Sequence, residues 1–144
     1  MSQPISPDGF HRRLFLISGA ALTSQTGQTA GMRRIEAISG KSVGSRRLWM
    51  GETHVSPDTR SANHHHGESE TGIYVVSGHP EFVFLDGDDE IRLAATAGDY
   101  IYVPPWVPHR EENLDPDVEA VVVLSRTTQE AIVVNLPDLR WIPR

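Results

Sequence analysis

The sequence predicts an all-β fold, built as a sandwich or small barrel of short strands. Runs rich in Val, Ile, Tyr and Phe, which strands prefer, recur at even intervals and are separated by Gly, Pro and Asp. No segment shows the sustained 3.6-residue periodicity of an amphipathic helix. The chain of 144 residues has no repeats, low-complexity tracts or linkers, which suits one domain with a single core.

The elements follow from the N-terminus onward. Residues 1–11 are polar and Pro-containing, and they predict a flexible tail. Strands are expected at 13–17, 34–38, 47–55, 71–76, 80–85, 90–94, 100–103, 118–125 and 131–135. The LDGDDE stretch at 85–90 places Asp-Gly between two extended runs and predicts a hairpin turn. The VPPWVP stretch at 103–108 is not a central strand, because its three prolines remove backbone donors.

Composition excludes several classes of function. The net charge of -6 argues against a nucleic-acid partner, because a phosphate-binding surface is normally basic. No apolar run approaches the roughly 18 residues that predict a membrane span. Cysteine is absent, so disulfides, thiolate ligands and thiol nucleophiles are ruled out. Any bound metal must therefore be held by histidines and carboxylates.

The HRRLFLISGAAL stretch at 11–22 resembles a twin-arginine export signal. Its apolar part is interrupted by Ser18 and Gly19, and no A-x-A cleavage site follows. An N-terminal strand followed by a Gly turn is the favoured interpretation. We accordingly expect a cytoplasmic protein, with export through this segment as the alternative.

Two stretches concentrate candidate metal ligands. In NHHHGESETGIYVVSG, at 63–78, an extended chain would point His64 and His66 to one face and His65 to the other. In GDYIYVPPWVPHREEN, at 98–113, the prolines end a strand and Pro108 fixes the approach to His109. A polar surface loop is the alternative for the triple histidine, but an apolar strand follows it directly. The pattern predicts a metal site that combines imidazoles from both stretches.

Together these stretches resemble the cupin superfamily. Its second motif, G-x5-P-x-G-x2-H-x3-N, is matched by Gly98, Pro104, His109 and Asn113, with Trp106 at the inner glycine. Its first motif, G-x5-H-x-H-x3,4-E-x6-G, is matched by His64, His66 and Gly78, with Asp58 at the opening glycine. The resemblance implies a single-domain cupin jelly-roll β-barrel over residues 12–144, with motifs at 58–78 and 98–113. It also implies one metal inside, held by the motif histidines and usually a glutamate.

The motif glutamate has two candidates one residue apart. Counting forward from His66 reaches Glu70, whereas counting back from Gly78 reaches Thr71. Strand alternation agrees with Thr71, because a shift of one residue turns a side chain to the other face. A β-bulge, for which Gly72 is a suitable place, would return Glu70 to the metal. We predict His64, His66, Glu70 and His109 as ligands, with Thr71 in place of Glu70 if no bulge forms.

The donor set suits one divalent ion among Fe, Mn, Ni, Co and Zn. By the resemblance, the expected function is a metal-dependent oxygenase, isomerase or decarboxylase acting on a small molecule, with a dioxygenase favoured. The alternative is a non-catalytic barrel that binds a metal or small molecule as a sensor or store. Strand alternation from His109 makes Glu111 the candidate catalytic residue. A homodimer is expected, because small cupins often pair through their edge strands.

Overall fold

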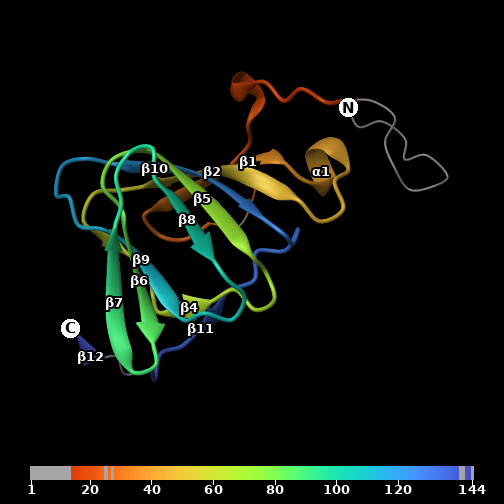
Figure 1. Cartoon of the computed structure of the whole chain (residues 1–144). Helices are drawn as coiled ribbons and strands as arrows, with labels where there is room; N and C mark the ends of the chain where they lie inside the picture. The colour runs from red at the N-terminus through yellow and green to blue at the C-terminus, as the bar shows by residue number, and fades with distance from the viewer. Residues whose placement is uncertain (1–13, 25, 27, 140–141, 144) are drawn as a thin grey trace.

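The structure, a computed structural model, describes residues 14–24, 26, 28–139 and 142–143, and its strands form two facing sheets (Figure 1). The first sheet has the order β1 (Met32–Ile38), β2 (Trp49–Val55), β10 (Ala120–Arg126), β5 (Thr71–Ser77) and β8 (Tyr100–Val103). The second has the order β11 (Val134–Asn135), β4 (His64–His65), β9 (His109–Asn113), β6 (Glu81–Asp86), β7 (Asp89–Ala94) and β12 (Ile142–Pro143). The short strand β3 (Thr59–Arg60) pairs with β9. The described helices are one 3-10 turn at Gly19–Ala21 and α1 at Gly40–Val43.

The connections between the sheets produce a jelly-roll sandwich. Strand β10 lies between β2 and β5, and β9 lies between β4 and β6, so neighbours in each sheet are distant in sequence. The pairs are antiparallel except for β12 beside β7. The predicted all-β jelly-roll fold is confirmed. None of the described helices is long and apolar enough to cross a membrane.

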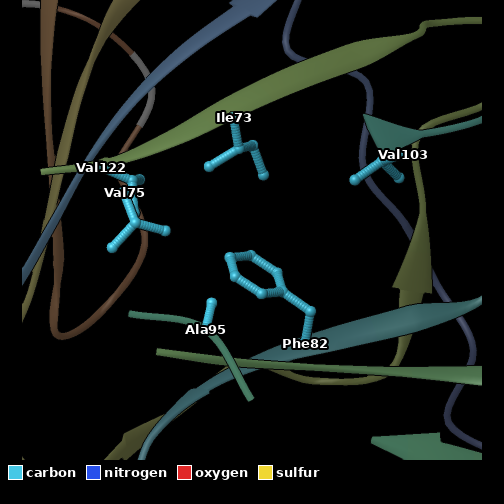
Figure 2. Close-up of a cluster of buried hydrophobic side chains, with 6 residues drawn as sticks. All are labelled: Ile73, Val75, Phe82, Ala95, Val103 and Val122. Carbon is cyan, nitrogen blue, oxygen red and sulfur yellow. The ribbon is translucent and has the colours of Figure 1, made fainter. Parts of the chain in front are cut away.

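The hydrophobic core fills one part of the space between the sheets (Figure 2). Ile73 and Val75 project from β5 toward Phe82, which comes from β6 in the opposite sheet. The inward faces of the strands alternate with outward ones, as in β5, where Thr71, Ile73 and Val75 are buried. Met32, Val55 and Ala120 form a second apolar cluster. Polar side chains are buried in the interior as well, and His64, His109 and Thr71 among them belong to the region of the candidate site described below.

The sequence predicted most of the long strands. Seven expected strands, from 34–38 to 118–125, are confirmed within two residues of their bounds, as is the 85–90 hairpin, where Asp86 pairs with Asp89. The strand expected at 131–135 is limited to Val134–Asn135. The prediction of a strand at 13–17 is wrong: residues 14–17 adopt no regular structure. The predicted tail at 1–11, and with it the first part of the export-like segment, lies outside the described residues.

Strand β9 was not predicted. All five of its side chains, His-Arg-Glu-Glu-Asn, are polar, and they follow the proline-rich stretch that ends β8. Residues with high strand propensity are those that pack well against apolar neighbours. A strand whose inward face carries site residues lacks them, so its sequence does not predict a strand. Strand β9 nevertheless pairs with β6 in the second sheet. The register runs from Glu81 opposite Glu112 to Phe84 opposite His109.

Candidate metal centre

Three imidazoles meet at one end of the interior. His64 on β4 pairs directly with His109 on β9, and His66 follows immediately after β4. The His64 ring centroid lies 4.5 Å from that of His109 and 4.8 Å from that of His66, and the His66–His109 separation is 4.9 Å. His64 and His66 therefore point to the same side, as their spacing predicted.

Backbone carbonyls fix the orientation of all three rings. Nδ1 of His64 lies 2.6 Å from the Ala62 oxygen, Nδ1 of His66 lies 2.8 Å from the Ile132 oxygen, and Nδ1 of His109 lies 2.9 Å from the Val107 oxygen. A carbonyl oxygen only accepts, so each neutral ring carries its hydrogen on Nδ1 and presents a lone pair on Nε2. Nε2 of His109 is buried and has no hydrogen-bond partner among the described residues. Such an orphaned lone pair fits a metal ligand.

The environment also favours the neutral form of two of these rings, those of His66 and His109. Burial lowers the pKa of His66 to about 4, and the neighbouring His109 and His64 rings add to this effect. Burial likewise lowers the pKa of His109. A neutral imidazole is the form that binds metal, so no proton has to leave these two rings at neutral pH.

Glu111 supplies a carboxylate to the same group. It lies two residues after His109 on β9, so both side chains project to the same face of the strand. One ligand atom from each of His64, His66, His109 and Glu111 lies within 4.8 Å of the others. The three Nε2 lone pairs and one carboxylate suit a divalent first-row metal. Glu111 was expected as a catalytic candidate, and the structure places it among the groups that could hold the metal.

Glu70 and Thr71 occupy opposite sides of β5. Thr71 is buried and lines the interior cavity, whereas Glu70 is exposed and accepts a 2.6 Å hydrogen bond from the Tyr102 hydroxyl. The pairing of β5 with β8 is regular from Thr71 to Tyr74, so no bulge occurs at Gly72. The register of β5 shifts only near its end, where Val121 and Val122 pair with Ser77 and Val75. The structure thus does not bring Glu70 to the three histidines.

The remaining histidine of the triplet lies apart from this group. Nδ1 of His65 accepts a 3.0 Å hydrogen bond from the Gly67 amide, and its ring contacts Trp106 at a centroid distance of 5.5 Å. Trp106 itself has a φ of 66°, and Asp58 has a φ of 50°. Both stand where the two sequence motifs have glycine, which adopts this left-handed conformation without strain. The turns of the motifs are therefore retained although their glycines are replaced.

A cavity of about 200 Å³ adjoins the candidate centre. His66, Glu111 and Thr71 form part of its wall. Its apolar lining comes mainly from both sheets and from the segment after β10, and comprises Val55, Ile73, Pro80, Phe82, Val122, Leu124, Ala131, Ile132 and Val133. Arg34 and Arg126 are also in the wall. A small molecule held there would lie beside the imidazole group and be shielded from water.

The aromatic side chains of the strands differ in their relation to the cavity. Phe82 does line the cavity, and Trp49 is buried beneath Arg126. Tyr100 and Tyr102 are on the exposed face of the first sheet. Asn113, the last motif residue, is fully buried, and its Nδ2 lies 3.1 Å from the Val55 oxygen and 2.9 Å from the Val118 oxygen. It anchors the end of β9 and so positions His109 and Glu111.

The fold and the histidine group agree with the comparison to known families. The model of the Cupin domain family matches residues 51–125, more than half of the chain. The chain belongs to this family, as its two motifs predicted. A comparison with curated protein sequences gives no significant match.

Solved structures share this fold at low identity. The polyketide cyclase RemF from Streptomyces resistomycificus superposes with a TM-score of 0.69 at 20% identity, covering 86% of this chain and 86% of that one. An uncharacterized double-stranded β-helix protein from Klebsiella pneumoniae gives 0.59 at 19% identity, covering 78% and 90%. The oxalate decarboxylase of Bacillus subtilis gives 0.64 at 20% identity, covering 76% of this chain and 29% of that one. These likenesses concern the fold, and a fold does not specify the reaction.

Proposed function

We propose that this protein is a metal-dependent enzyme that converts a small molecule inside its cavity, by oxygenase, isomerase or decarboxylase chemistry. The observation that carries this proposal is the orientation of the three imidazoles. A backbone carbonyl lies at the Nδ1 of each ring, which leaves Nε2 as the available ligand atom, and the Nε2 of His109 is buried without a hydrogen-bond partner among the described residues. One ligand atom of each ring also lies within 4.8 Å of those of the others, an arrangement that a purely structural histidine cluster would not need.

His64, His66, His109 and Glu111 would hold one divalent ion. The ion would act as a Lewis acid toward an oxygen-bearing substrate or as a site for O₂. The carbonyls of Ala62, Ile132 and Val107 hold the rings in place, which maintains the donor geometry during reaction. The apolar part of the cavity wall lowers the local polarity, which strengthens electrostatic interactions with the substrate.

Several metals fit the donor set. Iron, manganese, nickel, cobalt and zinc all bind imidazole with carboxylate, and the absence of cysteine in the chain leaves only these donors. The oxalate decarboxylase neighbours are described as having Mn(II) centres, which makes manganese one of the ions to test first. The cytoplasmic location and the homodimer remain predictions.

The first test is the metal content of protein purified without added metal, followed by titration of the chelator-treated protein with Mn(II), Fe(II) and Co(II). We expect one ion per chain, and we expect His64→Ala and His109→Ala to lose it. His65→Ala is the matched control, since His65 lies outside the group, and should bind like the wild type. Full metal occupancy in His64→Ala and His109→Ala would show that the site is wrong.

The second test separates an enzyme from a passive binding protein. The metal-loaded protein is supplied with thiols, diketones, catechols and small carboxylic acids, while oxygen consumption and product formation are followed. Metal-dependent turnover that is lost in His109→Ala supports the proposal. Tight metal binding without turnover on any of these classes would favour the alternative, a non-catalytic metal or small-molecule binding protein.

A further inference from the structure

A buried arginine stands in the wall of the same cavity. Arg126 is the last residue of β10 and pairs with Trp49 on β2 and with Thr71 on β5. It is 9% exposed, and its guanidinium carbon lies 4.0 Å from the centroid of the Trp49 ring. Trp49 is itself almost fully buried. Stacking on this ring fixes the plane of the guanidinium group and leaves its edge for hydrogen bonding.

The hydrogen bonds of Arg126 leave part of that edge unused. Nε donates to the Thr128 oxygen at 3.0 Å, and one Nη donates to the Gln129 oxygen at 2.8 Å. A guanidinium group has five N–H donors, so the bonds within the described residues use two of them. No carboxylate of the described residues lies within the 4.0 Å ion-pair distance of Arg126. Glu36, which attracts it from farther away, accepts a 2.9 Å hydrogen bond from Trp49 Nε1.

A second arginine, Arg34, lies near enough to Arg126 to repel it. Burial, together with repulsion from Arg34, lowers its pKa to about 10, so it still carries its charge at neutral pH. Arg34 also lines the cavity, where it donates a 2.7 Å hydrogen bond to Thr29 Oγ1. A buried cation without an ion-pair partner costs free energy, and such a cost is commonly met at binding sites.

We propose that Arg126 binds a carboxylate of the substrate, and that the substrate is a small organic acid whose other end carries an oxygen donor for the metal. This inference rests on the proposed metal-dependent function. The cavity wall contains Arg126, apolar side chains from both sheets, and then His66 and Glu111 of the metal group. A molecule with a charged end, a short apolar middle and a metal-binding end would contact the arginine, the apolar side chains and the metal ligands in turn.

The same cavity disfavours a phosphate ester. Apolar side chains make up much of the wall, and moving a doubly charged phosphate out of water into such surroundings costs more than moving a singly charged carboxylate. The planar guanidinium also matches the planar carboxylate, with which it forms two parallel hydrogen bonds. The small cavity volume of about 200 Å³ further limits the substrate to a compact acid.

The test uses ligands that bind the metal at one end. Monohydroxamates of succinic, glutaric and adipic acid each present a hydroxamate for the metal and a carboxylate at a graded distance. Their carboxamide analogues have nearly the same shape but no charge. Calorimetric titration of the metal-loaded protein should show, at the best chain length, about tenfold or stronger binding of the acid than of the amide. Equal affinities of acid and amide at every length would overturn the inference.

Substitution then assigns the preference to the residue. Arg126→Gln should abolish the preference for the acid while leaving amide affinity and metal content unchanged, and Arg47→Gln, at an exposed position, should change neither. If Arg126→Gln fails to fold, the wild-type comparison of acid with amide decides alone.

A failure of the wild type to bind metal would contradict the proposed function rather than the role of Arg126. Metal-free protein titrated with 3-phenylpropionate and with its amide then tests Arg126 by itself, and equal affinities there would overturn its role.

Discussion

An acidic residue precedes strand β5 and another lies within strand β9, but only the second joins the three histidines. Glu70 comes directly before β5, is exposed, and accepts a hydrogen bond from Tyr102. Glu111 lies within β9, two residues after His109, and joins the imidazoles. The first motif of the family expects its carboxylate at the start of β5, yet the inward position there is held by Thr71.

The difference shows that strand alternation, not closeness in sequence, decides which acid can reach the candidate metal centre. Glu70 is one residue away from the inward-facing Thr71 and therefore points outward. Glu111 is two residues away from His109 and therefore lies on the same face of the strand as His109. The candidate metal centre thus retains one carboxylate, although this carboxylate comes from the second sheet rather than the first. Each prediction below either breaks this contrast or sharpens it.

The largest effect is expected from neutralising the two acids separately. Glu111→Gln should weaken metal binding at least about 100-fold, since loss even of a residue that only orients a ligand costs about 10- to 100-fold. Glu70→Gln is the matched control and should change the affinity less than about twofold, because its side chain faces outward. Isothermal titration with Mn(II) or Co(II) measures both. The reverse order of effects would mean that β5 supplies the carboxylate.

The next prediction concerns the other acid of β9. Glu112 is 3% exposed and accepts hydrogen bonds from Arg92 at 2.6 Å and from Arg110 at 2.7 Å. Glu112→Gln should lower the free energy of unfolding by about 2 kcal/mol, less than for a fully buried pair because both arginines are partly exposed. Denaturant titration, with Glu70→Gln expected to stay within about 0.5 kcal/mol of wild type, provides the measurement.

The same residue predicts a dependence on pH. Burial alone would raise the pKa of Glu112, but the hydrogen bonds from Arg92 and Arg110 outweigh it and lower the pKa below the ordinary 4.5. A lowered pKa in the folded state stabilises the protein above pH 4.5, and this stabilisation is lost as the pH falls through the folded value. The stability difference between wild type and Glu112→Gln should therefore shrink between pH 5 and pH 3. A difference that stays constant over this range would contradict the assigned ion pairs.

Much of this arrangement was accessible from the sequence, for identifiable reasons. The alternation of Thr71, Ile73 and Val75 is visible in their side chains, and the spacing of His64 and His66 places them on one side. The strand character of β9 was hidden, because its polar side chains face a site and its own ion pairs rather than an apolar core. The two-residue step from His109 to Glu111 was the available signal, and it pointed to the site once β9 was taken as extended.

Moving the metal-binding carboxylate from Glu111 on β9 to the inward position of β5 would directly test whether strand alternation places the ligand. Thr71 is the inward residue at the position where the motif has glutamate, and its side chain lines the cavity. In the Glu111→Gln background, Thr71→Glu should recover about tenfold in metal affinity, as one restored charge-assisted contact would. Thr71→Gln in the same background is the control of matched shape and should recover none. If Thr71→Glu gave no recovery, strand parity alone would not suffice to place a ligand.

The smallest effect concerns the turns that lead into the two regions. Trp106, with φ of 66°, precedes β9, and Asp58, with φ of 50°, precedes β3 and β4. A left-handed conformation costs most residues roughly 1–2 kcal/mol, and a substitution by glycine removes this cost. Glycine loses more backbone entropy on folding, however, and this loss offsets part of the stabilisation. Trp106→Gly should therefore raise the free energy of unfolding by about 0.5 kcal/mol, and Asp58→Gly by less, because Asp tolerates this conformation better. Trp106→Ala removes the ring but keeps the unfavourable φ, so it should not stabilise. If Trp106→Ala stabilised as much as Trp106→Gly, the exposed ring rather than the backbone would be the source of the strain.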